Sequence, residues 1–144
     1  MIRETQHPEE TQKLAQELLP LILEHKNVLL IGQLGSGKTT FSKGLAQSLG
    51  ITQPVTSPTY TYSNRYQLPH ALQGYTDLIH FDLYRLPEES LHPEQTAAEI
   101  GLSEALEDPR HLVLIEWPER LKITEKALQI RFETLENVHR ISTE

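Results

Sequence analysis

The 144-residue sequence predicts an α/β fold, with helices on both faces of a mostly parallel sheet and a final pair of antiparallel strands. The apolar run 28–31 is typical of a buried strand, and a helical pattern follows it from Lys38 until Gly50. A second apolar run, 111–118, ends in an acid and a proline. Strands that alternate with helices predict a parallel sheet.

The first half of the chain surrounds this strand and helix. Residues 8–24 carry leucine and isoleucine at helical spacing and predict an amphipathic helix, interrupted or ended near Pro20. Residues 51–62 contain two prolines, which exclude a helix and predict a short extended segment. Residues 64–76 are polar, with a proline and a glycine, and predict a surface loop or hairpin connection.

The second half begins with residues 78–86, which predict a buried strand that contains Asp82. Residues 88–106 predict one or two helical pieces, broken near Pro93 and Gly101. Residues 127–132 and 138–141 alternate apolar and polar side chains and predict the terminal antiparallel pair. With no repeat or linker, we expect one domain spanning residues 1–144.

Composition excludes several classes of protein. There are no cysteines, so disulfides and thiolate chemistry are excluded. We find neither a 20-residue apolar run nor a signal peptide, and we expect a cytoplasmic protein. The net charge is −7 and the basic residues are dispersed, which argues against binding nucleic acid unaided. Any action on RNA is therefore expected to need a partner.

The strongest motif is Gly-Gln-Leu-Gly-Ser-Gly-Lys-Thr at 32–39, which fits the Walker A pattern G-x-x-x-x-G-K-[ST]. Glycines let successive backbone N–H groups point at an anion, and the helix that follows adds the positive end of its dipole. Lys38 would reach the β/γ-phosphates of a nucleotide, and the Thr39 hydroxyl would ligate Mg²⁺. The alternative is an ordinary glycine-rich turn. The order of strand, loop and helix favours a phosphate-binding P-loop.

Two acids are candidates for the metal-binding carboxylate of such a site. Asp82 and Glu116 each follow an apolar run, and a carboxylate at the carboxyl end of a strand meets the metal of a bound nucleotide. One could bind the ion directly and the other through water. The alternative for either is a solvated acid at a strand end.

Weaker candidates surround these residues. The segment 51–62 could place a threonine hydroxyl, such as that of Thr59, near the γ-phosphate, or it could be a plain surface loop. Arg65, Arg85 and Arg120 could each offer charge to a transition state, although a surface ion pair is the alternative for each. The seven histidines show no ligand spacing and are interpreted as structural or surface groups.

Five separated stretches resemble one known family, the TsaE (YjeE) proteins. In chain order they are GQLGSGKTTF at 32–41, VTSPTYT at 55–61, HFDLYRL at 80–86, EIGLSE at 99–104 and IEWPE at 115–119. The stretches at 80–86 and 115–119 are more specific than the P-loop. The resemblance runs from the N-terminal helix to Glu119, and the part beyond Lys122 carries no matching motif.

The resemblance implies a P-loop NTPase-like three-layer α/β/α sandwich that hydrolyses ATP with Mg²⁺ as a P-loop ATPase. It implies association with TsaD and TsaB, which place a threonylcarbamoyl group on the adenosine beside the anticodon of tRNAs that read ANN codons. Catalytic roles fall on Lys38, Asp82 and Glu116, and Mg²⁺ on Thr39, Asp82 and Glu116. Nucleotide-binding roles fall on Gly35, Ser36, Gly37, Lys38, Thr39, Thr40, Thr59 and Trp117.

Two departures from the family's pattern matter. The family has an acid where this chain has Gln33, which puts any role of that carboxylate in doubt, whereas Ser36 in place of alanine should be harmless. The water-positioning residue stays open among Asp82, Glu116 and Thr59. Two other functions also stay open: a small-molecule kinase, for which the sequence shows no clear acceptor pocket or arginine-bearing lid, and a nucleotide-dependent interaction module.

Overall fold

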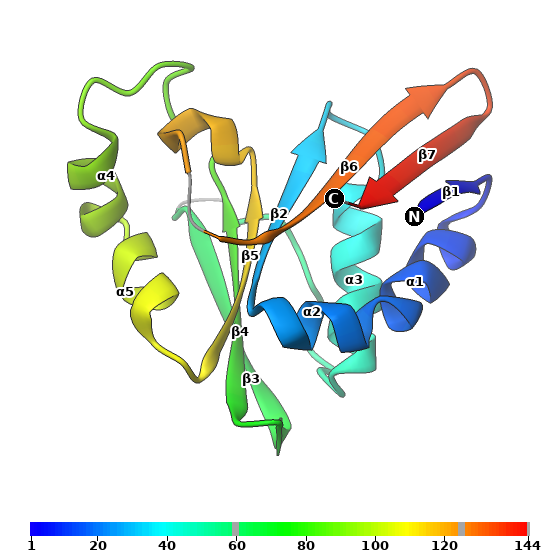
Figure 1. Cartoon of the computed structure of the whole chain (residues 1–144), viewed down its shortest axis with the longest axis horizontal. Helices are drawn as coiled ribbons and strands as arrows, with labels where there is room; N and C mark the ends of the chain where they lie inside the picture. Colours follow the sequence, from blue (N-terminus) through cyan, green and yellow to red (C-terminus); the bar gives the residue numbers. More distant parts are fainter. Residues whose placement is uncertain (59–60, 124–125, 144) are drawn as a thin grey trace.

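The computed structural model describes residues 1–58, 61–123 and 126–143, which form one seven-stranded sheet with helices on both faces (Figure 1). No helix in these ranges is long and apolar enough to cross a membrane. The sheet order is β1-β7-β6-β2-β5-β4-β3. In chain order the elements are β1 (Ile2–Thr5), α1 (Pro8–Glu17), α2 (Leu19–His25), β2 (Asn27–Gly32), α3 (Lys38–Ser48), β3 (Ser63–Leu72), β4 (Tyr75–Asp82), α4 (Pro93–Glu99), α5 (Leu102–Glu107), β5 (His111–Glu116), the 3₁₀ helix η1 (Pro118–Leu121), β6 (Leu128–Leu135) and β7 (Val138–Thr143).

The centre of the sheet is parallel. Strand β2 pairs in parallel with β5 on one side and β6 on the other, and β4 pairs in parallel with β5. The flanking pairs β3–β4, β6–β7 and β1–β7 are antiparallel. Strands β2, β4 and β5 therefore end at one edge of the sheet, here called the carboxyl edge, and begin at the opposite amino edge. The expected α/β fold is confirmed, but the sheet is mixed: its core is parallel, and the pairs β3–β4 and β1–β7 are antiparallel in addition to the expected C-terminal pair β6–β7.

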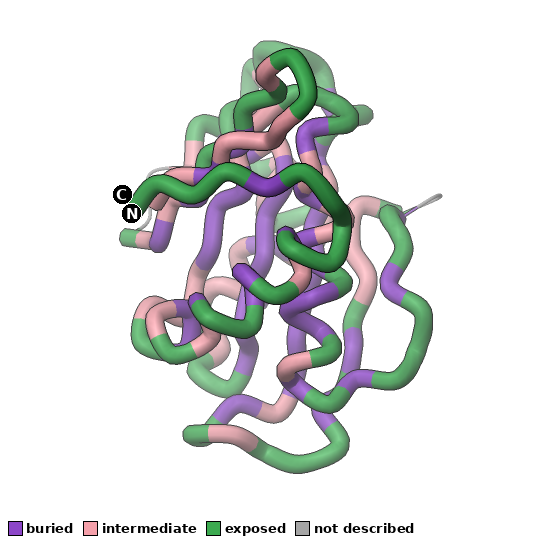
Figure 2. The backbone as a smooth tube through the Cα atoms, turned by 90° about the vertical axis from the view of Figure 1, so that its right-hand side faces the viewer, coloured by how far each residue is buried: buried purple, intermediate pink, exposed green. Residues whose placement is uncertain are grey.

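Two hydrophobic cores lie on the two faces of the sheet, because side chains alternate along each strand. Leu30, Leu78 and Leu114 pack with residues of α1, α2 and α3, whereas Phe81 and Ile115 pack with residues of α4, α5 and η1. Figure 2 shows the buried residues gathered along the central strands and the exposed ones on the outer loops. The side chains of His80, Asp82 and Glu116 continue the row that faces α3.

The predicted helices are present with small changes. The expected helix over 8–24 is divided at Leu18 into α1 and α2, so that Pro20 lies in the first turn of α2, where its missing N–H is tolerated. Helix α3 begins at Lys38 and ends before Gly50. Helices α4 and α5 are separated at Gly101, as expected, but Pro93 begins α4 rather than breaking a helix. The terminal hairpin β6–β7 is also confirmed.

Two strands at the edges of the sheet differ from the predictions. The expected surface loop or hairpin connection over 64–76 is reduced to the turn at 73–74, and residues 63–72 are strand β3, because Tyr66 and Leu68 are buried in alternation with exposed neighbours; the register shifts beyond Gln67, where Pro69 cannot donate to the ladder. The described part of 51–62 contains neither helix nor strand, which agrees with the exclusion of a helix there. Strand β1 was not predicted, since only Thr5 of its four residues is buried.

Candidate functional site

The loop between β2 and α3 lies at the carboxyl edge and depends on glycine at two positions. A Cβ on Gly32 would lie 2.6 Å from the Phe132 carbonyl oxygen and 2.8 Å from Ser36 Oγ, so no side chain fits there. Gly37 precedes α3 with φ = 108°, a left-handed conformation that favours glycine. The chain therefore turns tightly from strand to helix, and its N–H groups are free of side-chain obstruction at these two points.

A cavity of about 230 Å³, here called the loop cavity, opens beside this loop. It is lined by Leu34, Gly35, Gly37, Lys38, Thr39, Thr40, Ser57, Asp82, Glu116, Trp117 and His139. The structure thus brings most of the predicted site residues to one place, although they come from the P-loop, β4 and β5. Ser36 belongs to the loop but not to this lining; its hydroxyl is buried and has no partner among the described residues. Thr59 lies outside the described residues.

Lys38 is the central cation of the loop cavity. Its side chain is buried, and Nζ donates a hydrogen bond to the Gly32 carbonyl and lies 4.0 Å from the centre of the Trp117 ring. Burial lowers the pKa of Lys38, while the nearby Glu116 and Asp82 raise it. A bound anion would stabilise the charged ammonium that burial disfavours.

The two strand-end acids lie side by side. Asp82 and Glu116 are direct partners in the parallel pairing of β4 with β5, so both side chains are on the face toward α3. Burial raises the pKa of Asp82, and Glu116 raises it further, while the Tyr84 N–H donates to Asp82 Oδ1 at 3.1 Å and lowers it. Two neighbouring carboxylates at the end of a parallel strand pair offer oxygen ligands of the kind that a divalent cation takes.

Glu116 has a fixed partner on the neighbouring strand. Its Oε2 lies 2.6 Å from Nε2 of His80, and the two side chains are only 4% and 1% exposed. His80 is therefore part of the buried wall of this site, although it does not line the loop cavity itself. No local sequence pattern predicts this contact, because the two residues lie on different strands.

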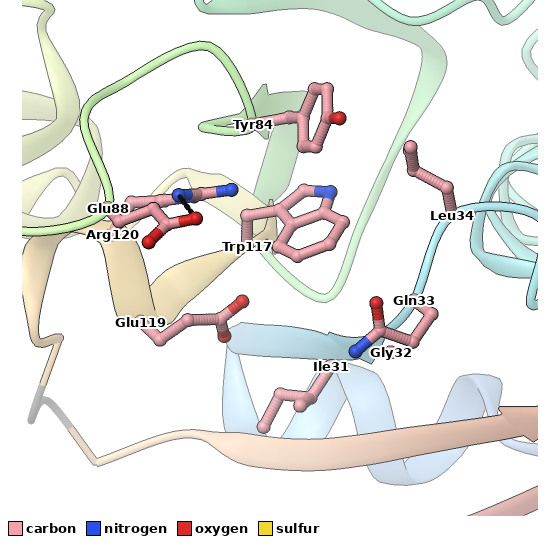
Figure 3. Close-up of a pocket in the computed structure, with 9 residues that line it drawn as sticks. All are labelled: Ile31, Gly32, Gln33, Leu34, Tyr84, Glu88, Trp117, Glu119 and Arg120. Carbon is pink, nitrogen blue, oxygen red and sulfur yellow. Dashed lines mark ion pairs between the residues drawn. The ribbon is translucent and has the colours of Figure 1, made fainter.

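A second, larger cavity of about 730 Å³ adjoins the first and shares Leu34 and Trp117 with it (Figure 3). We call it the aromatic cavity, because the rings of Trp117 and Tyr84 line it with their centres 5.0 Å apart. The Arg120 guanidinium lies 5.2 Å from the Trp117 ring and 5.6 Å from the Tyr84 ring. The other residues that line the aromatic cavity are Ile31, Gly32, Gln33, Glu88, Glu119 and Arg120. Gln33 thus lines the aromatic cavity and not the loop cavity.

Two of the candidate arginines lie away from both cavities, whereas one histidine that was not a candidate lies at the loop cavity. Arg65 pairs with Asp77 at 2.9 Å on strands β3 and β4, near the amino edge. Arg85 is exposed and lines neither cavity. His139, which was interpreted with the other histidines as a structural or surface group and was not among the predicted site residues, lines the loop cavity from β7. It reaches the site only because β7 pairs with β6, which pairs with β2, and no local pattern predicts that path.

The fold and the site define a class: an α/β protein in which a glycine-rich loop and two strand-end carboxylates enclose a cavity suited to an anion and a divalent cation. The family model for TsaE, described as threonylcarbamoyl adenosine biosynthesis protein TsaE, matches residues 5–142. The chain belongs to the TsaE family. The match continues past Lys122 through β6 and β7, where we had found no matching motif.

Similar proteins agree with this membership. Proteins named tRNA threonylcarbamoyladenosine biosynthesis protein TsaE are 42% identical over 113 residues in Synechocystis, 35% over 128 in Bacillus subtilis and 36% over 124 in Aquifex aeolicus. These matches cover 76%, 88% and 85% of this chain, and 62%, 73% and 80% of those proteins. The crystal structure of YdiB from Bacillus subtilis superposes with a TM-score of 0.71 at 29% identity, covering 98% of this chain and 82% of that one.

Proposed function

We propose that this protein is a P-loop ATPase with a P-loop NTPase-like three-layer α/β/α sandwich fold, which supports formation of threonylcarbamoyladenosine in tRNA. The observation that carries the proposal is the loop cavity, because it combines the Walker A residues with both strand-end acids. A glycine-rich turn that served only the fold would not need a buried lysine and two neighbouring carboxylates around a cavity. The reaction is ATP + H₂O → ADP + phosphate.

The loop and α3 would bind the phosphates. N–H groups from Gly35 to Thr40 and the amino end of the 11-residue helix α3 offer donors and a positive dipole to an anion. Lys38 would leave the Gly32 carbonyl for the β- and γ-phosphates, where its charge is stabilised. Preorganised donors of this kind stabilise the charge that develops on the transferring phosphoryl group.

Thr39, Asp82 and Glu116 would hold Mg²⁺, directly or through water. Among residues 1–58, 61–123 and 126–143, no group of three or more His, Cys, Asp or Glu side chains suits a metal ion. This fits magnesium, which takes only one or two protein carboxylates and completes its shell with phosphate oxygens and water. When bound, the ion neutralises charge between the phosphates. Asp82, Glu116 and Thr59 remain the candidates for orienting the attacking water.

The names of the relatives supply the biological setting. We propose that the protein acts with TsaD and TsaB in the cytoplasm and meets tRNA through them. The net charge of −7 supports this indirect contact, since phosphate neutralisation dominates direct binding to nucleic acid. TsaD and TsaB would transfer the threonylcarbamoyl group, while ATP hydrolysis here would permit repeated turnover.

One observation favours a second candidate, a small-molecule kinase. The aromatic cavity adjoins the loop cavity and is lined by Arg120, so the space and the arginine that such a kinase would need for its acceptor lie next to the proposed phosphate site. The two functions differ in their products. A kinase would yield a phosphorylated acceptor, whereas the ATPase releases inorganic phosphate in equal amount to ADP.

The test is a pair of measurements on the full chain. ATP turnover is compared for the protein alone and with TsaB and TsaD, and threonylcarbamoyladenosine is measured in tRNA from cells that lack their own TsaE and carry this chain. We expect faster phosphate release with the partners and restored modification. Turnover that stays absent beside the partners would favour the interaction module, and ADP without phosphate release would favour the kinase.

A further inference from the structure

His80 is a buried histidine that none of the proposed roles uses. It lies on β4 two residues before Asp82, so both side chains are on the face of the sheet toward α3. The residues before it in the same rows, Leu78 on β4 and Leu112 and Leu114 on β5, belong to the hydrophobic core. His80 therefore stands where this face changes from apolar core to charged site.

The only polar partner of the His80 ring among the described residues is Glu116. Nε2 lies 2.6 Å from Glu116 Oε2, a length typical of a charge-assisted hydrogen bond. The other ring nitrogen, Nδ1, is buried without a partner in the described part of the chain. Because the carboxylate oxygen can only accept, this contact needs a proton on Nε2, and Nε2–H donates to Glu116 Oε2.

This hydrogen bond restricts the orientation of the Glu116 carboxylate. A carboxylate has two oxygens, and the bond from His80 occupies Oε2, which leaves Oε1 for a ligand in the loop cavity. Lys38 also attracts Glu116 electrostatically and lies in the same lining. Without His80, the carboxylate would be free to turn toward the ammonium, and both groups would be lost to the nucleotide and its cation.

We propose that His80 is a positioning residue, which holds Glu116 for the divalent cation and keeps it from neutralising Lys38. The inference rests on the proposed function, since the cation is the one that accompanies the nucleotide. Hydrogen-bond partners behind metal-binding groups typically change metal affinity by about 10- to 100-fold when they are removed.

The test uses His80→Leu, which removes the donor, and His80→Gln, whose Nε2 amide can still donate. His111→Leu is the matched control, because His111 is also a buried histidine on β5, faces the carboxylate of Asp108 at 3.4 Å and lies at the amino edge. Mn²⁺ affinity is measured by electron paramagnetic resonance on the full chain with ADP, and ADP affinity is measured separately in EDTA.

We expect His80→Leu to weaken Mn²⁺ binding by about 10-fold or more while ADP binding in EDTA changes by less than about threefold. His80→Gln should recover most of the loss, and His111→Leu should match wild type in Mn²⁺ affinity even if its melting temperature falls. Wild-type Mn²⁺ affinity in His80→Leu, or a His80→Gln variant as weak as His80→Leu, overturns the inference. Wild-type protein that binds no ADP overturns the proposed function and this inference with it.

A second measurement is made on the wild-type chain. Nitrogen-15 NMR of histidine side chains shows which ring nitrogens carry a proton, and His80→Gln serves only to assign the resonance. We expect a proton on Nε2 that is protected from solvent exchange. A ring without a proton on Nε2 could not donate to Glu116 and would contradict the proposal, whether or not the leucine variant folds.

Discussion

The two edges of the sheet both carry charged side chains, but the charged forms are stabilised at the amino edge and disfavoured by burial at the carboxyl edge. At the amino edge, Asp77 pairs with Arg65 at 2.9 Å, and Asp108 pairs with Arg110 at 2.9 Å. These contacts lower the pKa of both aspartates, first through hydrogen bonds from the arginines. At the carboxyl edge, burial raises the pKa of Asp82 and lowers that of Lys38.

The difference in pKa shifts between the two edges distinguishes charges that stabilise the fold from charges at the proposed nucleotide site. Charges of the amino edge have their partners within the protein, so their ionised forms are stabilised on folding. At the carboxyl edge, burial disfavours the charged forms of Lys38 and Asp82, which would gain from a bound phosphate and a bound cation. Perturbed groups that converge on a cavity are typical of functional sites.

The buried Lys38 and the half-buried Lys26 give the largest expected contrast between the two edges. Lys38→Met should reduce nucleotide affinity by about 100-fold or more, because the phosphates lose a preorganised cation. Lys26→Met, at the amino edge, should leave nucleotide affinity unchanged but lower stability, since Lys26 Nζ donates to the carbonyls of Ala105 and Leu106 at the end of α5. Titration calorimetry with ADP and thermal melts check both. Equal effects of the two changes on affinity would remove the distinction between the edges.

Glu116→Gln should affect turnover more than binding. The amide is similar in shape but cannot hold a cation as a carboxylate does, so ATP hydrolysis beside TsaB and TsaD should fall by about 100-fold. Nucleotide affinity in EDTA should stay within about threefold of wild type, because Lys38 and the loop bind the phosphates. Asp108→Asn is the control at the amino edge and should retain wild-type turnover. Full activity of Glu116→Gln would mean that Asp82, and not Glu116, is the carboxylate that the reaction needs.

Asp77→Asn and Asp82→Asn should change stability in opposite directions at neutral pH. The folded pKa of Asp77 lies below the ordinary value of 3.8, so Asp77 contributes stability above that pH, which is lost as the pH falls through the folded pKa. The folded pKa of Asp82 lies above 3.8, so its contribution is present at low pH and is lost as the pH rises through the folded value.

We therefore expect Asp77→Asn to lower the free energy of unfolding at pH 7 by about 1 kcal/mol or less, since Arg65 is exposed and solvent screens the pair. Asp82→Asn should raise it by a similar amount, and the Tyr84 N–H can still donate to the amide oxygen. Urea unfolding at pH 7 and near pH 3 checks this, and both differences should shrink at the lower pH. If both substitutions changed the free energy of unfolding in the same direction at pH 7, the proposed difference between the two edges would be contradicted.

His139 should show the smallest effect at the carboxyl edge. It contributes one ring to the lining of the loop cavity, so His139→Ala should weaken nucleotide binding by about fivefold, the equivalent of one hydrogen bond. His70→Ala, an exposed histidine on β3, is the control and should bind nucleotide as the wild type does. Unchanged affinity in His139→Ala would mean that β7 closes the cavity without touching the ligand.

The sequence predicted the centre of the molecule better than its edges. Strands β2 and β5, helix α3 and the acids Asp82 and Glu116 follow from short apolar runs and the fixed P-loop pattern, because both signals are local. Strand β3 was missed because its polar face and Pro69 resemble a loop, although Tyr66 and Leu68 alternate inward. Strand β1 buries a single residue and has no pattern to find.

The parts of the site that come from strand pairing could not be predicted. The parallel pairing of β6 with β2 brings the terminal hairpin beside the loop and carries His139 into the cavity. The bond between His80 and Glu116 depends on the register of β4 with β5. Such registers are set by the whole sheet, whereas a motif scan considers one segment at a time.

Trp117 has a consequence for how the molecule can be studied. It is the single tryptophan of the chain, and its ring centre lies 4.0 Å from the ammonium of Lys38 and 5.2 Å from the guanidinium of Arg120, in the lining that the two cavities share. Any ligand that draws Lys38 away changes the electric field on the indole, so ultraviolet fluorescence reports the occupancy of the loop cavity without a label. The protein thus contains its own optical probe at the point where a nucleotide and a neighbouring molecule would meet.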